Sequence, residues 1–312
     1  MNQPLVTIGV PAYNEGPYIR EALESLLKQG YANLEIIVAD NGSTDNTGAI
    51  CDEVAARDAR VVRVRQPRNI GQNANFNHLP RIANGTYFAW ASAHDFMDAD
   101  FVEKCVAALE ADPAAVLACP RTVYLDERGN PTGVKKRTPF DIRGMAPDVR
   151  FRTTMWRVDC NIVYGMYRLG PMRETNFFQL VPAPDRVFLA ELAIKGTFVP
   201  ADTAKYYRPN RGTVPQTELQ KRHRLMRYIW PERTFADAEL TGNGFYAPTI
   251  RAFRSVALNA DFPFLARVRC LFSVWLCGVM KFHLFPGADA MSAIVKTLLP
   301  KPVLRAVMRT MQ

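Results

Sequence analysis

Acidic residues follow two apolar segments of strand length, at positions where proteins commonly do chemistry. Asp40 comes directly after residues 34–38, a run rich in Ile and Val, and is followed by a glycine turn. Asp95 comes shortly after a second apolar run, residues 86–91. In an open α/β sheet, ligands bind at the carboxyl ends of the strands, so Asp40 can accept hydrogen bonds from a ribose or a base. The alternative is that Asp40 only fastens its own turn as an Asx motif.

Asp95 closes the segment of residues 92–95, and Asp98 and Asp100 follow it closely. Mg²⁺ and Mn²⁺ prefer oxygen ligands and share them with phosphates. A cation bound there would also stabilise a departing diphosphate. We therefore favour a metal site at Asp95. For Asp98 and Asp100 we expect the other role, capping the helix that follows.

A third carboxylate, Asp185, lies between a proline and an arginine, just before the apolar segment 187–196. A carboxylate held at the edge of a helix can act as a general base. It can also cap that helix. From these residues alone, capping is the better interpretation.

The elements that must position these side chains follow from the apolar pattern. Up to residue 120, short apolar runs alternate with segments of helical periodicity. We expect strands at residues 5–10, 34–38, 61–65, 86–91 and 115–119. Strand–helix alternation with short connections predicts an α/β fold with a mostly parallel sheet flanked by helices.

Beyond residue 120 the pattern changes, and the predicted elements become less regular. We expect a long loop over the site at 126–150, an amphipathic helix at 151–170, a helix at 187–196, short strands at 197–200 and 204–207, and mainly helices from about 216. This pattern places one domain at residues 1–212, with a nucleotide-binding part at about 1–120 and a second part at about 121–212. A basic helical region at 213–312 completes the chain.

The charge is unevenly distributed along the 312 residues. The net charge is +9, but residues 1–120 hold 9 Lys/Arg against 15 Asp/Glu, and residues 121–312 hold 30 against 15. The acidic half suits a divalent cation and the basic half an anionic surface. No nucleic-acid module is recognisable, so we expect no nucleic-acid partner and favour an anionic acceptor or an anionic membrane surface.

The six cysteines are scattered and form no CxxC pair, which predicts neither a disulfide framework nor a zinc site. The N-terminus shows no signal-peptide pattern. We therefore expect a cytoplasmic protein, with the inner face of the membrane as a second possible location. The apolar run 270–280 has eleven residues, fewer than the roughly 20 that a spanning helix needs. It can lie in a membrane interface, or pack on the catalytic domain or on a second subunit as in a homodimer; packing is slightly preferred.

Five motifs together resemble one known family. They are Pro11–Glu15, Asp40–Asp45, Arg68–Gly71, the strand into His94–Asp95, and Asp185 before an apolar helix. Their order and spacing resemble those of the family-two glycosyltransferases, which are inverting enzymes of the GT-A fold that use nucleotide-sugar donors. The resemblance covers roughly residues 4–210, and its specificity comes from five motifs in register.

The resemblance implies a role for each matching residue. It implies that Asp185 is the catalytic base and that Asp95 belongs to the metal-binding acidic motif, with Mg²⁺ or Mn²⁺ as cofactor. The implied nucleotide-sugar-binding residues are Pro11, Ala12, Tyr13, Glu15, Asp40, Asn41, Asn69, Gly71, Asn73, His94 and Arg208.

The chain departs from the family pattern at two places. Asn41 stands where many members have a second Asp, and residues 92–95 contain one carboxylate where two or three are usual. His94, within that segment, is a poor ligand for Mg²⁺. The acidic motif is therefore degenerate.

The resemblance implies an enzyme that moves a sugar from a nucleotide-sugar donor to a hydroxyl of a glycan or a lipid-linked acceptor, in bacterial surface polysaccharide biosynthesis. The alternative is a non-catalytic relative that binds a nucleotide sugar or serves as a partner subunit. A dinucleotide-dependent oxidoreductase is disfavoured, because no GxGxxG follows the first strand.

Overall fold

A computed structural model describes residues 3–132, 140–211, 216–241 and 244–280. It divides the chain into two compact units, which we call the sheet unit and the helical unit. The sheet unit comprises residues 1–143, 159–174 and 198–215, and the helical unit comprises residues 144–158, 175–197 and 216–312. The two units are interleaved along the chain, because two segments before residue 198 belong to the helical unit, and the domain boundary at residue 212 stays a prediction.

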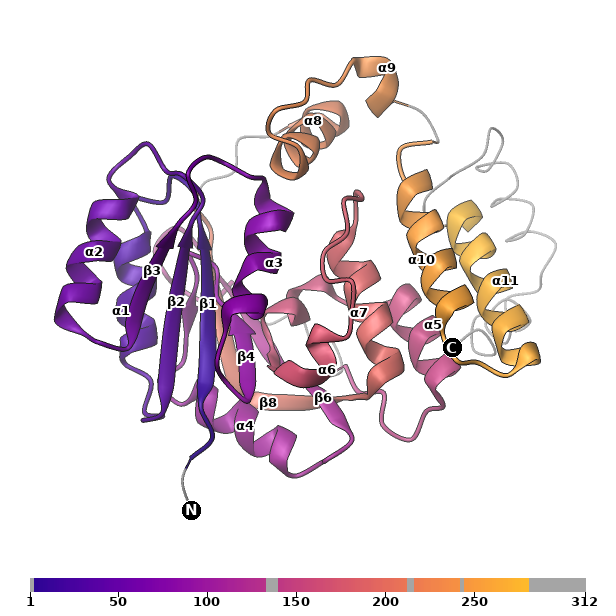
Figure 1. The fold of residues 1–312 in the computed structure, drawn as a ribbon, viewed down its shortest axis with the longest axis horizontal. Coiled ribbons are helices and arrows are strands. Elements are labelled where there is room, and N and C mark those ends of the chain that lie inside the picture. The colour runs from indigo at the N-terminus through magenta and orange to yellow at the C-terminus, as the bar shows by residue number, and fades with distance from the viewer. Residues whose placement is uncertain (1–2, 133–139, 212–215, 242–243, 281–312) are drawn as a thin grey trace. The chain divides into compact units, whose positions relative to one another are not determined.

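The sheet unit is built on a single eight-stranded sheet with the order β3-β2-β1-β4-β7-β6-β8-β5 (Figure 1). Its strands are β1 (Val6–Ala12), β2 (Leu34–Asp40), β3 (Val61–Arg65), β4 (Tyr87–Trp90), β5 (Phe96–Met97), β6 (Ala115–Leu125), β7 (Met166–Arg168) and β8 (Thr197–Pro209). All five strands predicted before residue 120 are confirmed. The pairs β1–β2, β2–β3 and β1–β4 are parallel, and the pairs β4–β7, β6–β7 and β5–β8 are antiparallel.

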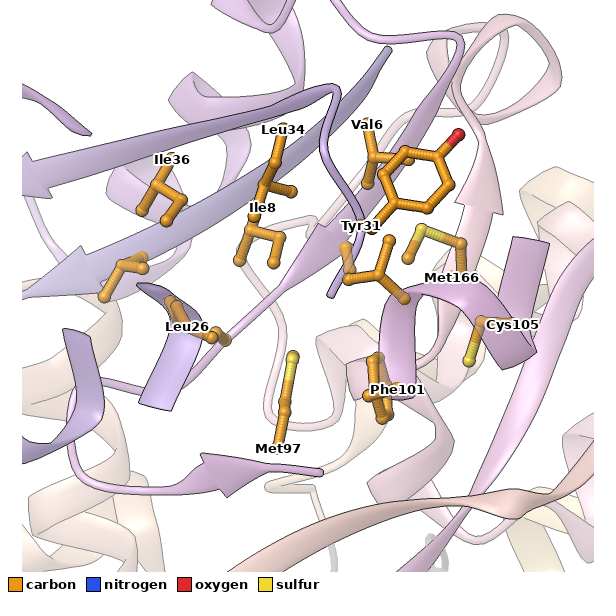
Figure 2. Packing of buried hydrophobic residues seen from close by; sticks show 14 of the residues in the cluster. Val6, Ile8, Leu26, Tyr31, Leu34, Ile36, Met97, Phe101, Cys105 and Met166 are labelled. Carbon is orange, nitrogen blue, oxygen red and sulfur yellow. The ribbon is translucent and has the colours of Figure 1, made fainter. Parts of the chain in front are cut away.

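Helices cover both faces of the parallel part, which explains why its strands are almost continuously apolar. The helices of the sheet unit are α1 (Ile19–Leu27), α2 (Thr47–Arg57), α3 (Gln72–Ile82), α4 (Phe101–Glu110), the short α6 (Leu169–Arg173) and the 3₁₀ helix η1 (Cys160–Tyr164). Alternate residues of β1, such as Ile8, pack in one core with Leu26 of α1 and Phe101 of α4 (Figure 2). On the other face Gly9 lies against Leu79 of α3, so close that a Cβ at Gly9 would come within 3.0 Å of it.

The prediction of one helix over residues 151–170 is wrong. Instead of one helix, the structure has α5 (Pro147–Arg157), then η1, then β7, and α6 begins at Leu169. β7 is paired on both sides within the sheet. Met166 and Tyr167 are fully buried there. Their apolar spacing satisfies a helix and a buried strand equally well, and tertiary pairing decides between the two.

The helical unit packs four helices around a second core. These are α5, α7 (Pro184–Lys195), α10 (Ala247–Asn259) and α11 (Phe264–Met280), and the core includes Phe151, Val187, Phe253 and Cys270. The predicted helix at 187–196 is confirmed, with its start three residues earlier. The helices α8 (Glu218–Ile229) and α9 (Asp237–Leu240) form a smaller cluster around Met226 and Leu240.

Residues 133–139 of the predicted loop and residues 281–312 of the predicted helical region lie outside the described residues. Over the part that the structure describes, no helix has both the length and the apolar character needed to cross a bilayer.

Candidate functional site

The loop after β1 and the loop after β2 are fastened together by hydrogen bonds from side chains to backbone. Because β1 and β2 are parallel neighbours, with Ala12 paired to Asp40, both loops leave the sheet at the same edge. Asn14 adopts a positive φ of 53°. Its N–H donates to Ser43 Oγ at 3.0 Å, and its own Oδ1 accepts the Thr44 N–H at 2.9 Å. Two segments of the predicted nucleotide pocket are therefore held as one polar surface.

Further hydrogen bonds join the same two loops at the next residues along each loop. The N–H of Glu15 donates to Thr47 Oγ1 at 2.8 Å, and the N–H of Gly16 donates to Asp45 Oδ2 at 3.0 Å. The hydroxyl of Thr47 donates in turn to Asp45 Oδ1. Of the predicted residues in this loop, Tyr13 is 41% exposed, and its ring is open to a ligand.

Asp40 is almost completely buried at the end of β2. Its Oδ1 accepts the Ser43 N–H at 2.9 Å, which is the Asx-type turn that the sequence left open as an alternative. Its Oδ2 accepts from Nη1 of Arg63 at 3.1 Å. Both carboxylate oxygens thus have a partner within the protein.

Asn41, at the position where many family members have a second aspartate, makes two hydrogen bonds that an ionised aspartate could not make together. Its side-chain Oδ1 accepts the Ile70 N–H at 2.9 Å, while its Nδ2 donates to Asn69 Oδ1 at 2.9 Å. Asn69 Oδ1 also accepts the Gly71 N–H at 2.9 Å. An asparagine can donate and accept at once, whereas a carboxylate can only accept. The amide therefore joins the loop after β2 to the loop before α3.

Glycines permit the close approach of these loops. Gly42 has φ +73°, and a Cβ there would lie 2.7 Å from the backbone carbon of Arg68. Gly71 has φ +89° and forms the N-cap of α3. Asn73 follows it in the first turn and is buried. The predicted residues Asn69, Gly71 and Asn73 therefore lie in one short segment next to Asn41.

His94 and Glu15 form a polar pair at the neighbouring strand end. Nδ1 of His94 lies 3.1 Å from Glu15 Oε1 and 3.2 Å from Oε2. The hydrogen bond with Glu15 raises the pKa of His94 above its ordinary value, because it favours the imidazolium form. β1 and β4 are adjacent and parallel, so the loops that carry these two residues emerge side by side.

Asp95 is the buried carboxylate of the site. The hydroxyl of Tyr206 donates to Asp95 Oδ2 at 3.1 Å and accepts the Ser92 N–H at 2.9 Å. Nε of Arg208 lies 3.5 Å from the same carboxylate oxygen. Burial raises the pKa of Asp95 although Arg208 and His94 oppose that effect. The structure thus brings together Asp95 and Arg208, two residues to which the family resemblance gives roles.

Several residues of this site escape the sequence analysis. Tyr164 stacks on Tyr206 with ring centroids 4.7 Å apart, and the guanidinium of Arg208 lies 5.7 Å from the Tyr164 ring. Arg208 also donates to Asn161 Oδ1. Tyr164 and Asn161 belong to η1, within the segment that we predict as part of a long helix. Tyr206 belongs to the segment Tyr206–Arg208, which resembles one that lies near the diphosphate in the family, and it shares a strand face with Arg208 because the two residues are two apart.

Arg211 is a second arginine at this strand end that the sequence analysis misses. Its guanidinium lies 4.5 Å from the Tyr18 ring and 5.5 Å from the Phe96 ring. Its Nη2 donates to the backbone oxygen of His94 at 3.2 Å. Arg208 and Arg211 thus bring two permanent positive charges to the loop that carries Asp95.

Asp98 and Asp100 do not cap α4 with their side chains, so that expectation is wrong. Asp100 occupies the N-cap position but makes no side-chain capping bond, and it pairs instead with Lys104 at 2.7 Å. Burial and a hydrogen bond with Asp98 raise the pKa of Tyr207 to about 12. Both acids are therefore engaged on neighbouring side chains.

Asp185 belongs to the helical unit, in the first turn of α7. The N-cap residue is Ala183, so Asp185 is not the capping residue that the local sequence favours. Its Oδ1 accepts the N–H of Arg186 at 2.8 Å, and the side chain is half-buried. The convergence of Asp185 with Asp40 and Asp95 on one cleft stays a prediction.

The residues around Asp95 provide a small set of metal ligands. Among the described residues no group of three or more His, Cys, Asp and Glu side chains could hold a metal ion. Asp95 uses Oδ2 for Tyr206, and His94 uses Nδ1 for Glu15. Mg²⁺ is usually held by one or two carboxylates together with substrate phosphates. These residues therefore fit a cation only if phosphate oxygens of the substrate complete its ligands, with Asp95 as the protein carboxylate.

Comparison with solved structures defines the class of protein. The structure of residues 1–349 of S. aureus TarS in complex with UDP covers 93% of this chain and 75% of that chain, with a TM-score of 0.58 and 17% identity. The mannosyltransferase PcManGT from Pyrobaculum calidifontis, in complex with GDP-Man and Mn²⁺, covers 100% of this chain and 85% of that chain, with a TM-score of 0.51 and 17% identity. The fold is that of the GT-A glycosyltransferases.

The family follows from the sequence match. The family model described as glycosyl transferase family 2 matches residues 7–168, just over half of the chain. The chain belongs to this family.

Curated relatives include bacterial enzymes. Glycosyltransferase GlyG of Streptococcus pneumoniae is 35% identical over 127 residues, 40% of this chain and 42% of that protein. The chondroitin synthase of Escherichia coli is 37% identical over 129 residues, 41% of this chain and 18% of that protein. The chain thus matches less than half the length of these relatives.

Proposed function

We propose that this chain is an inverting glycosyltransferase that moves a sugar from a nucleotide-sugar donor to a hydroxyl of a glycan or a lipid-linked acceptor. The observation that carries the proposal is the shared sheet edge, where polar loops after β1 and β2, joined by hydrogen bonds, lie next to the buried Asp95 and its partner Arg208. One side offers hydrogen bonds to a nucleoside, and the other offers positive charge to a diphosphate.

The nucleoside side consists of the loops after β1 and β2 and the loop before α3. The base and ribose would contact Pro11 to Tyr13, the turn that Asp40 begins, and the segment around Asn69. The hydrogen bonds between these loops support this role, because they hold the polar groups in place before a ligand arrives. The TarS structures contain UDP and UDP-GlcNAc, and the PcManGT structure contains GDP-Man. These two bases are the first to test here.

The diphosphate side would be served by Arg208. Breaking the bond between the anomeric carbon and the diphosphate leaves negative charge on the departing oxygen, and fixed positive charge in a buried place stabilises it. Arg208 is held by Asn161 and by the Tyr164 ring, so little reorganisation is needed as that charge develops. Arg211, held between two aromatic rings, adds to the positive potential.

A divalent cation would be bound by Asp95 and by oxygens of the diphosphate. It would supply Lewis-acid stabilisation of the leaving group. Tyr206 would orient Asp95 for that role, since its hydroxyl fixes one carboxylate oxygen while the other stays available. We expect chelation of divalent cations to lower transfer markedly and to leave Arg208 supplying the remaining stabilisation.

Asp185 would accept the proton of the attacking acceptor hydroxyl. That oxygen attacks the anomeric carbon from the face opposite the diphosphate, which inverts the configuration. The family resemblance and the position of Asp185 in the first turn of α7, where its side chain is only half-buried, support the assignment.

The relatives named for chondroitin and hyaluronan synthesis support a place in polysaccharide biosynthesis. We propose that the reaction serves bacterial surface polysaccharide assembly and takes place in the cytoplasm. The scattered spacing of the six cysteines in the sequence supports a reducing compartment.

The test is a panel of UDP, GDP and dTDP sugars with and without Mn²⁺, measuring release of nucleoside diphosphate. Asp185→Asn should lower turnover by at least about 10³-fold, because a general base is lost, and leave binding of the nucleoside diphosphate within a factor of two. Asp202→Asn, an exposed acid on β8, is the control. Unchanged turnover in Asp185→Asn would refute the assignment. Nucleotide-sugar binding with no turnover on any acceptor would favour the non-catalytic alternative, for which the single carboxylate in residues 92–95 is the supporting feature.

A further inference from the structure

One face of α11 is left exposed by the helical unit. The opposite face packs in the core with α5 and α10, through Ala266, Cys270, Val274 and Cys277. The exposed large side chains of this helix are all apolar apart from one arginine. They are Phe264, Leu265, Val268, Phe272 and Trp275, which range from 46% to 76% exposed.

These five side chains form one continuous stripe. At 3.6 residues per turn they fall within an arc of about 100° on the helix surface. Arg267 borders the arc on one side and Arg269 on the other. Phe272 and Trp275 stack within it, with ring centroids 5.7 Å apart. The helix has no acidic residue over Phe264–Met280.

The surroundings of the stripe are positively charged. Arg269 reaches the carboxylate of Asp148 at 3.7 Å yet stays 61% exposed, and Asp148 is shared with Arg152. Arg251 and Arg254 are exposed on α10, the helix that packs beside α11. In sequence, residues 251–312 contain 9 Lys/Arg against 2 Asp/Glu.

We propose that this face of α11 binds the interface of an anionic lipid bilayer. An apolar arc bordered by arginines is the pattern of a helix that lies in the membrane plane, with aromatic rings at the headgroup level and guanidinium groups on the phosphates. The helix has 17 residues and would lie along the surface. A second copy docked through the same face would bring two sets of arginines together without an acid on either helix to neutralise them.

The proposal goes beyond sugar transfer, since binding to lipid needs neither donor nor acceptor. Either claim can therefore fail while the other stands. If both hold, the lipid surface would concentrate the enzyme where a lipid-linked acceptor resides.

The experiment is co-sedimentation of the full chain with vesicles of phosphatidylcholine, with and without phosphatidylglycerol. We expect binding to the anionic vesicles, weaker binding at high salt, and little binding to phosphatidylcholine alone. Phe272→Ser combined with Trp275→Ser should weaken binding at least tenfold. Arg269→Glu should weaken it about fivefold or more. Val62→Ser combined with Tyr228→Ser removes two apolar side chains of similar exposure elsewhere and should leave binding unchanged.

A second measurement locates the contact. Brominated lipid should quench the fluorescence of the wild-type chain, and Trp275→Phe should remove most of that quenching while the other three tryptophans remain. Thermal unfolding checks that each variant is folded. The proposal is overturned if the chain stays in the supernatant with anionic vesicles. It is also overturned if Phe272→Ser with Trp275→Ser converts a dimer to a monomer in sedimentation velocity and leaves vesicle binding intact.

Discussion

Two regions of the sheet unit carry acidic side chains, and they use them in different ways. At the end of β2, Asp40 accepts the Ser43 N–H of its own turn, and Asp45 accepts the Gly16 N–H of the loop after β1. At the loop after β4, the carboxylate of Asp95 contacts the side chains of Tyr206 and Arg208. The first region joins loops, and the second holds a charge in a buried place.

The two regions should therefore differ in what they contribute, folding stability in the first and sugar transfer in the second. A carboxylate that accepts backbone N–H groups stabilises the native loops, and removing it leaves buried donors unpaired. Burial raises the pKa of Asp95, so ionisation of this carboxylate lowers folding stability. Such perturbed groups are typical of functional sites. We therefore expect mutations in the first region to reduce folding stability and mutations in the second to reduce transfer.

The largest effect on stability is expected for Asp40→Ala. The variant leaves the Ser43 N–H and one nitrogen of Arg63 without their buried partner. Breaking a buried ion pair costs about 3–5 kcal/mol, which urea unfolding would measure. Asp52→Ala is the matched control, since Asp52 binds the same Arg63 but is 58% exposed. Its loss should be at most about 1 kcal/mol. Equal losses in the two variants would contradict the role given to Asp40.

Asp95→Asn should show the opposite pattern. Transfer should fall by about 10²-fold or more, because we propose this carboxylate as the protein's ligand for the cation at the leaving group. The free energy of unfolding should stay within about 1 kcal/mol of wild type, since a neutral isostere keeps the shape and avoids burying a charge. Steady-state kinetics and urea unfolding measure the two quantities. A large loss of stability with full transfer in the surviving protein would make Asp95 a structural residue.

Gly42→Ala tests how tightly the loops are joined. The added Cβ would meet the backbone of Arg68 at 2.7 Å, and the φ of +73° is unfavourable for alanine. We expect a loss of about 2–3 kcal/mol. Gly129→Ala separates the two causes, because Gly129 has φ +81° with nothing within 4 Å of the added Cβ, and it should lose only about 1 kcal/mol. Similar losses at both glycines would show that loop packing adds little.

The sequence predicts the parallel part of the fold well, because each of its strands is a short apolar run between turn residues. It fails at β7, where Met166 and Tyr167 have a spacing that suits a helix as well as a buried strand. The segment becomes a strand because it pairs with β4 on one side and β6 on the other. These pairing partners are brought together only in the assembled sheet. β5, two residues long, has no periodic signal at all.

For the candidate site, the sequence indicates the residues that lie in motifs. It gives no sign of the residues that only hold another side chain in place. Asp95 and Arg208 lie far apart along the chain, yet the family resemblance implies a role at the site for both. Tyr164 and Asn161 orient Arg208 from a 3₁₀ turn whose residues carry no motif. The pairing of Glu15 with His94 likewise depends on β1 and β4 being neighbours.

The smallest expected effect comes from Asn41→Asp, which introduces the aspartate that many relatives have. At neutral pH the new carboxylate would face Asn69 Oδ1, an acceptor that today receives a hydrogen bond from Asn41 Nδ2. Two acceptors in contact, one of them on the buried residue 41, should lower the free energy of unfolding by about 1–2 kcal/mol.

The pH dependence of that loss identifies its cause. Once protonated, the carboxyl introduced by Asn41→Asp could donate to Asn69 again, so its pKa would be raised in the folded state. A raised folded pKa adds stability that is fully present below the unfolded value of about 3.9 and is lost as the pH rises through the folded value. The difference between variant and wild type should therefore shrink as the pH falls from about 7 toward about 4. A difference that stays constant over this range would mean that Asn41 stabilises the loop by packing and that its choice over aspartate has another cause.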